Sequence, residues 1–296
     1  MKKATRISWG GRNERVGEVL TNRLLPGEQA EKIGSFVYLG HVYPTNKSFP
    51  KSASGAGMNA HPHRGIITLS YLLSGLLRHR DSLGNHCIAK GGDALWMKAG
   101  NGIIHDETPD PHSAGPLHAI QFRINLPAVY KEETPAFRLL CSEDIPELEL
   151  PDEAGKLRII LGACGVKESP LTTYLQEFVF HVCLNPKSEF TYRLKRRPEY
   201  GIIVPGNPVH VNGQAVSNSH LVGFLDDPGV IRLHNPGITP ADVILFGSDE
   251  YTEPMVAEGP FVMTSRKEIA QAYRDFFEGR YGQLSIDPLT NVNCLF

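Results

Sequence analysis

The chain has 296 residues, of which 41% are apolar and 21% charged, proportions that are ordinary for a soluble globular protein. A formal net charge of −2 gives no electrostatic reason to expect direct nucleic-acid binding or an anionic membrane as partner. Five scattered cysteines without a Cys-x-x-Cys pair argue against a disulfide framework or a thiolate zinc site. The polar N-terminus lacks the apolar core of a signal peptide, and no stretch is long enough to span a membrane. We therefore expect a protein of the reducing cytoplasm.

Short segments rich in β-branched and aromatic residues recur along the chain between turn formers, and they predict strands. In chain order these segments are Ser35–Leu39, Ile66–Leu73, Cys87–Ala89, Ala94–Lys98, His118–Asn125, Leu157–Leu161, Phe178–Leu184, Tyr200–Val204, His220–Leu225, Val230–His234 and Asp242–Phe246. Many strands at short spacing indicate an all-β protein of sandwiches or barrels. An acidic, proline-bearing connection near Cys141–Gly155 separates two such sets, so we predict two β-barrels in tandem.

One helix is predicted near the C-terminus. The stretch from Ser265 to Glu268 matches a capping box, which satisfies the unpaired amide donors at a helix start. Apolar residues then recur at helical spacing, at Ile269, Tyr273, Phe276 and Phe277. Gly279 is placed to end the helix. We expect its aromatic face to pack against a barrel.

Two short pairs of metal-ligating residue types stand in the first half, His61-Pro-His63 and His105-Asp-Glu107. On a strand, alternate side chains point to the same face, so each pair can direct both members at one point. If the two strands lie side by side in a barrel, about 4.8 Å apart, the four ligands converge on one ion. Gly100 and Gly102 allow the tight turn before the second strand. Three imidazoles and one carboxylate suit Fe, Mn, Co, Ni, Cu or Zn better than Ca or Mg, so we predict a transition-metal site.

Several motifs in a fixed order carry a resemblance to a known family. They are His61-Pro-His-Arg-Gly65, Tyr71-Leu-Leu-Ser-Gly75, Asp81-Ser-Leu-Gly84, Gly92-Asp-Ala-Leu-Trp-Met97, Ala99-Gly-Asn-Gly-Ile-Ile-His-Asp-Glu107, Leu117-His-Ala-Ile-Gln-Phe122 and Gly259-Pro-Phe-Val-Met263. The chain resembles the pirin family of the cupin superfamily over nearly its whole length. The resemblance implies two tandem cupin barrels, of the double-stranded β-helix or jelly-roll type, and a short C-terminal helix. It implies a metal-binding barrel over residues 1–145 and a barrel without metal over residues 146–296, the second ending in the packing helix.

In pirins, iron is bound through residues that match His61, His63, His105 and Glu107, so the resemblance implies Fe2+ as the cofactor, with other divalent transition metals as alternatives. The second half of the chain holds histidines that form no His-x-His or His-x-Glu pair: His181, His210, His220 and His234. We interpret these as structural or solvent-facing. His118 is the candidate for a side chain that supports the metal ligands.

Two positions depart from the family pattern. Many pirins carry a glutamate four residues after the second histidine, where this chain has Ile67, and an aspartate where it has Gly40. Since Glu107 supplies the carboxylate ligand, we expect the metal to be retained, while a partner of the ligands or a proton acceptor is missing at Ile67. His41, beside Gly40, is a candidate hydrogen-bond partner near the site.

The resemblance implies an iron-dependent dioxygenase of the quercetin 2,3-dioxygenase type, acting on flavonols, in which Glu107 accepts the proton of the substrate's enolic oxygen. Its partners are then a small aromatic substrate and dioxygen. The apolar residues Met97, Ile103, Ile104 and Phe122 are candidates for a wall against a flat ring. The alternative is a non-enzymatic iron- or redox-sensing regulatory protein that binds a transcription factor or a metabolic enzyme, and it requires the same ligands. A small-molecule isomerase or a sugar-binding cupin is a third interpretation, since fold does not fix function.

Overall fold

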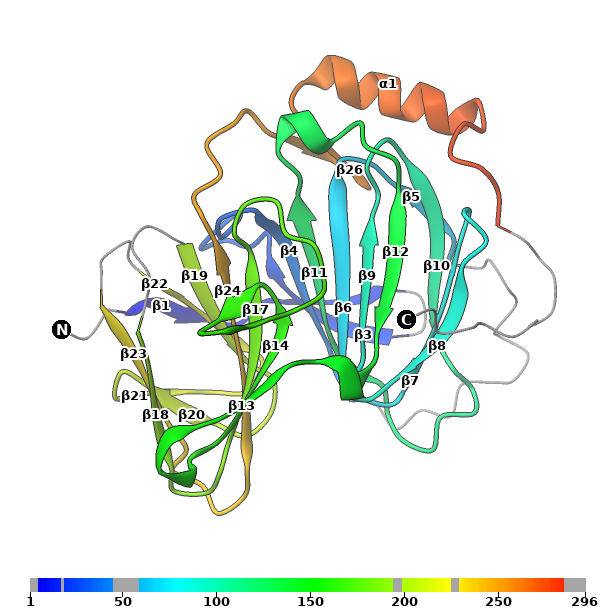
Figure 1. Ribbon diagram of the computed structural model, residues 1–296. Coiled ribbons are helices and arrows are strands. Elements are labelled where there is room, and N and C mark those ends of the chain that lie inside the picture. Colours follow the sequence, from blue (N-terminus) through cyan, green and yellow to red (C-terminus); the bar gives the residue numbers. More distant parts are fainter. Residues whose placement is uncertain (1–4, 17–18, 45–58, 194–198, 225–228, 285–296) are drawn as a thin grey trace. The chain divides into compact units, whose positions relative to one another are not determined.

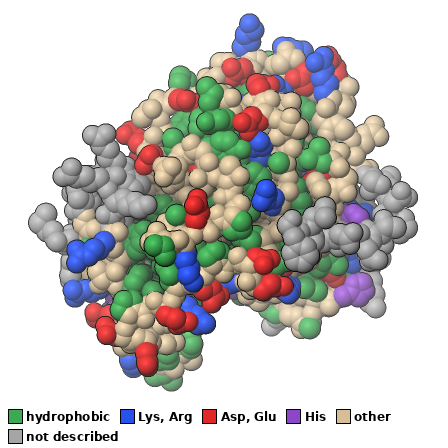
Figure 2. All heavy atoms as spheres, viewed as in Figure 1, with side chains coloured by type: hydrophobic (Ala, Val, Ile, Leu, Met, Phe, Trp, Pro, Cys, Tyr) green, Lys and Arg blue, Asp and Glu red, His purple; other side chains and the backbone are tan. Residues whose placement is uncertain are grey.

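The computed structural model describes residues 5–16, 19–44, 59–193, 199–224 and 229–284 (Figure 1). Most of them lie in strands, and one α-helix occurs in these ranges. Leu225, at the end of one predicted strand, and Cys294 lie outside the described residues. None of the described helices is long and apolar enough to cross a membrane. Acidic and basic side chains are interspersed on the face shown in Figure 2, in keeping with the small net charge.

Two compact units make up the chain, and neither is one continuous stretch of sequence. Unit 1 comprises Met1–Asn13, Asn22–His41 and Asp144–Tyr251, and unit 2 comprises Glu14–Thr21, Val42–Glu143 and Thr252–Phe296. Three strands contain a boundary between these segments: β2 (Arg12–Val16), β3 (Val19–Leu25) and β4 (Phe36–Val42). The division into residues 1–145 and 146–296 stays a prediction.

Unit 2 is built on two antiparallel sheets. One has the strand order β5 (His61–His63), β10 (Ile103–Pro109), β7 (Leu76–Asp81) and β8 (His86–Lys90). The other contains, as consecutive neighbours, β12 (Ala136–Leu140), β9 (Ala94–Lys98), β6 (Ile66–Ser74) and β11 (His118–Asn125). Both sheets contribute to one apolar cluster, which includes Leu72, Leu77, Cys87, Leu95 and Ala119. This cluster forms because alternate residues of each strand are apolar and face the same side.

Unit 1 has the same two-sheet plan. Its larger sheet has the order β1 (Thr5–Trp9), β22 (His220–Phe224), β19 (Glu199–Val204), β24 (Ala241–Ser248), β17 (Phe178–Leu184), β14 (Gly155–Leu161) and β13 (Glu147–Glu149). Its smaller sheet has the order β18 (Glu189–Arg193), β23 (Val230–His234), β20 (Val209–Val211) and β21 (Gln214–Val216). The hairpin of β15 (Ala163–Cys164) and β16 (Lys167–Glu168) and the 3₁₀ turn η3 (Pro151–Glu153) also belong to this unit, and the 3₁₀ turn η2 (Ser142–Asp144) contains the boundary between the units. The predicted two-barrel, all-β architecture is confirmed.

The predicted helix is confirmed as α1 (Arg266–Phe277), which belongs to unit 2 and follows the hairpin of β25 (Val256–Glu258) and β26 (Phe261–Met263). The Ser265 side chain accepts a hydrogen bond from the Glu268 amide, and Gly279 follows the helix end with a φ of +76°. Ile269 packs with the side chains of β26, and α1 lies across the strand ends of its unit (Figure 1). The expected packing of the aromatic face is wrong at Phe277, which is 79% exposed.

Candidate metal centre

The strand register brings the predicted ligands together on one sheet. β5 and β10 are antiparallel neighbours, with His105 opposite His61. On its other side β10 pairs with β7, which sets Glu107 opposite His79 and His105 opposite Asp81. Residues directly opposite each other in a sheet point to the same face. The predicted side-by-side arrangement of the two ligand-bearing strands is therefore confirmed.

The turn before β10 depends on two glycines, as the sequence predicted. Gly100 and Gly102 have φ angles of +47° and +127°, and the Gly102 amide donates to the Ala99 carbonyl at 2.8 Å. A side chain at Gly100 would meet the Glu133 carbonyl oxygen at 1.9 Å, so there is no room for one. Only glycine adopts such angles without strain. The turn is thus the local reason why β10 runs back alongside β5.

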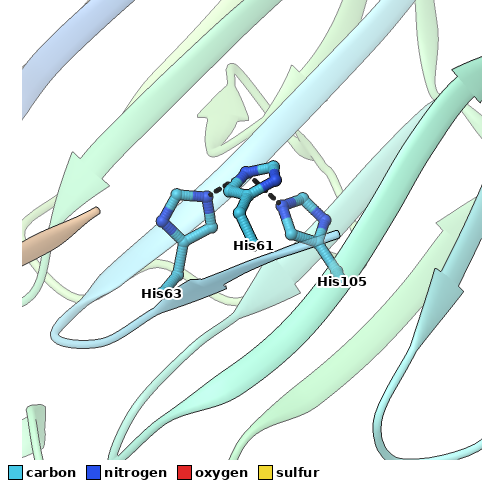
Figure 3. Close-up of side chains that lie close together, drawn as sticks. All are labelled: His61, His63 and His105. Atoms are coloured by element: carbon cyan, nitrogen blue, oxygen red, sulfur yellow. Dashed lines mark hydrogen bonds between the residues drawn. The ribbon is translucent and has the colours of Figure 1, made fainter. Parts of the chain in front are cut away.

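Three imidazole rings point toward one another at this place (Figure 3). The Nε2 atom of His61 lies 3.0 Å from Nε2 of His63 and 3.1 Å from Nε2 of His105. His63 and His105 are 1% exposed, and His61 is half-buried. Two of the three rings are consequently buried, and the His61 ring is partly accessible.

Backbone carbonyls fix which nitrogen of two of these rings carries the proton. Nδ1 of His61 lies 2.7 Å from the Asn59 carbonyl oxygen, and Nδ1 of His63 lies 2.9 Å from the Pro260 carbonyl oxygen. Because a carbonyl oxygen only accepts, both Nδ1 atoms must donate. In the neutral rings the Nε2 atoms of His61 and His63 then carry no proton, and their lone pairs face each other.

Burial keeps the three rings neutral. It lowers the pKa of His61, and the nearby Asn59 carbonyl only partly opposes this effect. The pKa values of His63 and His105 lie well below the ordinary range, first because of burial and then because of positive neighbours, among them Arg123. A neutral imidazole with a bare nitrogen is the form that binds a metal ion.

These atoms fit a transition-metal ion. Two nitrogens at right angles about an ion, each about 2.1 Å from it, are about 3.0 Å apart. The observed separations of 3.0 and 3.1 Å match this value. The unprotonated Nε2 atoms of His61 and His63 face each other, and a cation bound between them would stabilise this arrangement. His61, His63 and His105 therefore suit such an ion.

Glu107 lies beside His105 and His79. Its Oε1 atom is 3.8 Å from Nδ1 of His105 and 3.5 Å from Nδ1 of His79, and these three side chains form a second group of metal-ligating types. Its Oε2 atom accepts from Ser70 Oγ at 2.9 Å and faces Gln121 Nε2 at 3.4 Å. Strand β5 ends at His61, so Glu107 has no partner there and instead faces His79 on β7. That Glu107 is the fourth ligand remains a prediction.

His79 is the functional candidate that the sequence interpretation missed. It is fully buried, its Nε2 atom is 3.3 Å from Asp81 Oδ2, and its ring stacks on Phe137 with centroids 4.1 Å apart. Burial opposes protonation, but Asp81 and Glu107 outweigh it and raise the pKa of His79. The signal was present as His79-x-Asp81, the same two-residue spacing that marked the ligand pairs.

The sequence also singled out Ile67, on β6, as a position that bears on the metal centre. Thr68 and Ser70 pair in regular register with Met97 and Leu95 of β9, and Ser70 contacts Glu107. By alternation Ile67 points to the opposite face of β6, so a glutamate there would also point away from the centre. The expected loss of a partner or proton acceptor at Ile67 stays a prediction.

His41 belongs to unit 1 and not to the unit that holds the three rings. It is 1% exposed and contacts Ser219 at 2.7 Å within unit 1. Phe122 alternates with Gln121, which faces Glu107, so Phe122 points to the other side of β11 and is no part of a ring-binding wall. Met97 lies on the face of Thr68, and Ile104 packs with the cluster of α1.

Comparisons with known proteins identify the family. Residues 17–124 match the family model of pirin and residues 179–282 that of the pirin C-terminal cupin domain. A relative from Pseudomonas aeruginosa, named "Putative quercetin 2,3-dioxygenase", is 31% identical over 95% of this chain and 99% of its own. The chain belongs to the pirin family. Human pirin is 29% identical over 89% of this chain and 93% of its own.

Solved structures show the same fold. A quercetin 2,3-dioxygenase from Acinetobacter baumannii has a TM-score of 0.86 and 24% identity, and covers 95% of this chain and 99% of its own. A bacterial pirin from Escherichia coli in complex with nickel(II) has a TM-score of 0.63 and 18% identity, with 83% and 100% covered. The two units of this pirin-family chain are accordingly cupin domains, as the resemblance implied.

Proposed function

We propose that this chain is a metal-dependent dioxygenase that opens flavonol-type, quercetin-like substrates. The observation that carries the proposal is the cluster of three imidazoles in which Nε2 of His61 lies 3.0 Å from Nε2 of His63 and 3.1 Å from Nε2 of His105. The names of the Pseudomonas and Acinetobacter relatives, both quercetin 2,3-dioxygenases by name, support the substrate class. Partners are then a small aromatic substrate and dioxygen.

The cofactor that we propose is Fe2+, held by His61, His63 and His105, with Glu107 as the fourth ligand. A nitrogen-rich donor set with one carboxylate suits iron, and the nickel(II) complex of the Escherichia coli pirin supports a divalent transition metal in this family. When bound, such an ion supplies a Lewis acid and open positions for a chelating oxygen and for dioxygen.

The residues around Glu107 orient its carboxylate group. In our proposal Glu107 accepts the proton of the substrate's enolic oxygen on one of its carboxylate atoms. Ser70 and Gln121 hold Oε2, which orients the carboxylate. Nδ1 of His79 lies 3.5 Å from Oε1, and Asp81 and Glu107 raise the pKa of His79 against the effect of burial.

The test combines metal content with aerobic turnover of quercetin. Wild type, His61→Ala and Glu107→Gln are compared with His210→Ala, a half-buried histidine of unit 1 that serves as the matched control. We expect stoichiometric iron and turnover in wild type and in the control, loss of both in His61→Ala, and loss of turnover in Glu107→Gln. Absence of a bound transition metal after reconstitution refutes the metal centre. Stoichiometric iron without turnover refutes the dioxygenase and favours the regulatory protein.

A further inference from the structure

Unit 1 contains a cavity of about 320 Å³ that the metal centre does not use. It lies at the ends of β14, β17 and β19 and beside the β15–β16 hairpin, and all its lining residues belong to unit 1. Its size is within the range of pockets for small ligands. Among the described residues, neither group of metal-ligating side chains falls in this unit. Any ligand of this cavity would therefore be recognised by a chemistry other than metal ligation.

Aromatic rings form the inner wall. Phe178, Phe180 and Tyr200 are 8%, 0% and 3% exposed, and Tyr192 on β18 is half-buried. The Phe178 ring lies 4.9 Å from the Phe180 ring and 5.7 Å from the Tyr200 ring, while the Tyr192 ring meets Phe180 edge-on at 5.9 Å. Burial raises the pKa of Tyr192 to about 12, so its hydroxyl stays neutral. The rings offer apolar surface and the negative faces that attract cations.

Apart from the two tyrosines, all ionisable side chains that line the cavity are carboxylic acids. Glu168 and Asp249 are exposed at the mouth, and Glu177 is 1% exposed in the wall. None of the lining residues is a lysine, arginine or histidine. An anionic ligand would meet like charges here and find no counter-charge, whereas a cation would meet opposite charges.

Glu177 strengthens the preference of the cavity for a cation over an anion. Its Oε2 atom accepts from the amides of Tyr174 and Leu175 at 2.7 and 2.8 Å, and Oε1 accepts from the Ser35 hydroxyl at 3.5 Å. Burial raises the pKa of this carboxyl, although the two amides oppose the rise. A buried carboxylate without a cationic side chain in the cavity wall is costly, and a bound cation would offset that cost.

We propose that the cavity of unit 1 binds a small organic cation, an alkyl- or arylammonium ion whose apolar part lies against Phe178, Phe180 and Tyr192 and whose charge faces the carboxylates. This site is separate from the metal centre and does not depend on the dioxygenase proposal.

Isothermal titration calorimetry of the full, metal-loaded chain tests the charge preference. The probes are tetramethylammonium, choline and benzyltrimethylammonium, with 3,3-dimethylbutan-1-ol as the neutral molecule of choline's shape and benzoate as the anion. We expect saturable 1:1 binding of at least one cation, and binding of the alcohol to be about tenfold weaker or more. Equal affinity for choline and the alcohol, binding of benzoate alone, or no saturable binding of any cation overturns the proposal.

Single substitutions test whether the cation binds in the cavity of unit 1. Glu168→Gln is expected to weaken cation binding about threefold to tenfold, and Tyr192→Leu about tenfold. Glu189→Gln, an exposed change on the same strand as Tyr192 but outside the cavity, should bind as wild type does. His61→Ala should also retain full affinity, because His61 belongs to unit 2. Loss of cation binding in His61→Ala, or unchanged binding in both cavity variants, would show that the cation binds outside this cavity and would refute the proposed site.

Discussion

An ion pair connects the ligand-bearing strand β5 to the C-terminal helix. Arg64 directly follows His63, and its Nη1 atom lies 2.6 Å from Asp275 Oδ2 on α1. Arg64 and Asp275 are each 7% exposed. The second partner, Glu132, lies 2.8 Å from Nη2, but its side chain is 62% exposed. The buried Arg64–Asp275 pair should therefore contribute more to stability than the exposed Arg64–Glu132 pair.

Asp275→Asn removes the buried charge and keeps the side-chain shape. Breaking a buried pair from one side costs about 3–5 kcal/mol, and because Glu132 remains we expect about 3 kcal/mol. At about 2–4 °C per kcal/mol for a protein of this size, the Tm of the metal-free protein should fall by about 6–12 °C. The matched control Glu132→Gln removes an exposed charge, which is worth about 1 kcal/mol or less and should lower the Tm by less than about 4 °C.

Thermal and urea unfolding, followed by circular dichroism at pH 7, measure both variants. Burial alone would raise the pKa of Asp275, but the hydrogen bonds from Arg64 and Gln271 outweigh it and hold the pKa below its ordinary range. The pair therefore stabilises the fold fully above the unfolded-state pKa, about 3.9, and the gain is lost as the pH falls through the folded-state pKa. Equal losses in the two variants, or an intact Tm in Asp275→Asn, would refute this reasoning.

Three further predictions follow from the metal centre and its supports. Because burial lowers the pKa values of His63 and His105, the unfolded chain binds more protons below about pH 6.5, so the unfolding free energy of metal-free protein should rise with pH up to that value in denaturant titrations. Asp81→Asn removes the carboxylate that orients His79 beside Glu107, and it should weaken metal binding about tenfold to hundredfold in chelator competition. Unchanged metal affinity would show that Asp81 does not support the metal centre through His79. Gly65→Ala places a Cβ 2.1 Å from the Val262 carbonyl oxygen at a φ of +76° and should lower the unfolding free energy in urea titrations by about 1–3 kcal/mol or more. Gly84→Ala, with a φ of +86° and open space around it, is the control and should lose less.

Local pattern was sufficient for much of the fold. Ala94–Lys98, His118–Asn125, Phe178–Leu184 and Val230–His234 are strands with the predicted bounds, because alternation, β-branched content and flanking turn residues are local properties. The start of α1 at its capping serine was predictable for the same reason. The His-x-His spacing also placed His61 and His63 on one face, since the strand period is two.

Strand neighbours, in contrast, were decided only by the tertiary structure. The sequence by itself determined that His105 and Glu107 share a face, but not that β5 ends opposite His105 and leaves Glu107 facing His79. It likewise marked Ile67 as a departure without showing which face of β6 it occupies. It identified α1 as a packing helix without showing that the helix belongs to the unit of the metal centre. These outcomes depend on pairing between segments far apart in the chain, and pairing is set by the burial of whole faces rather than by any local signal.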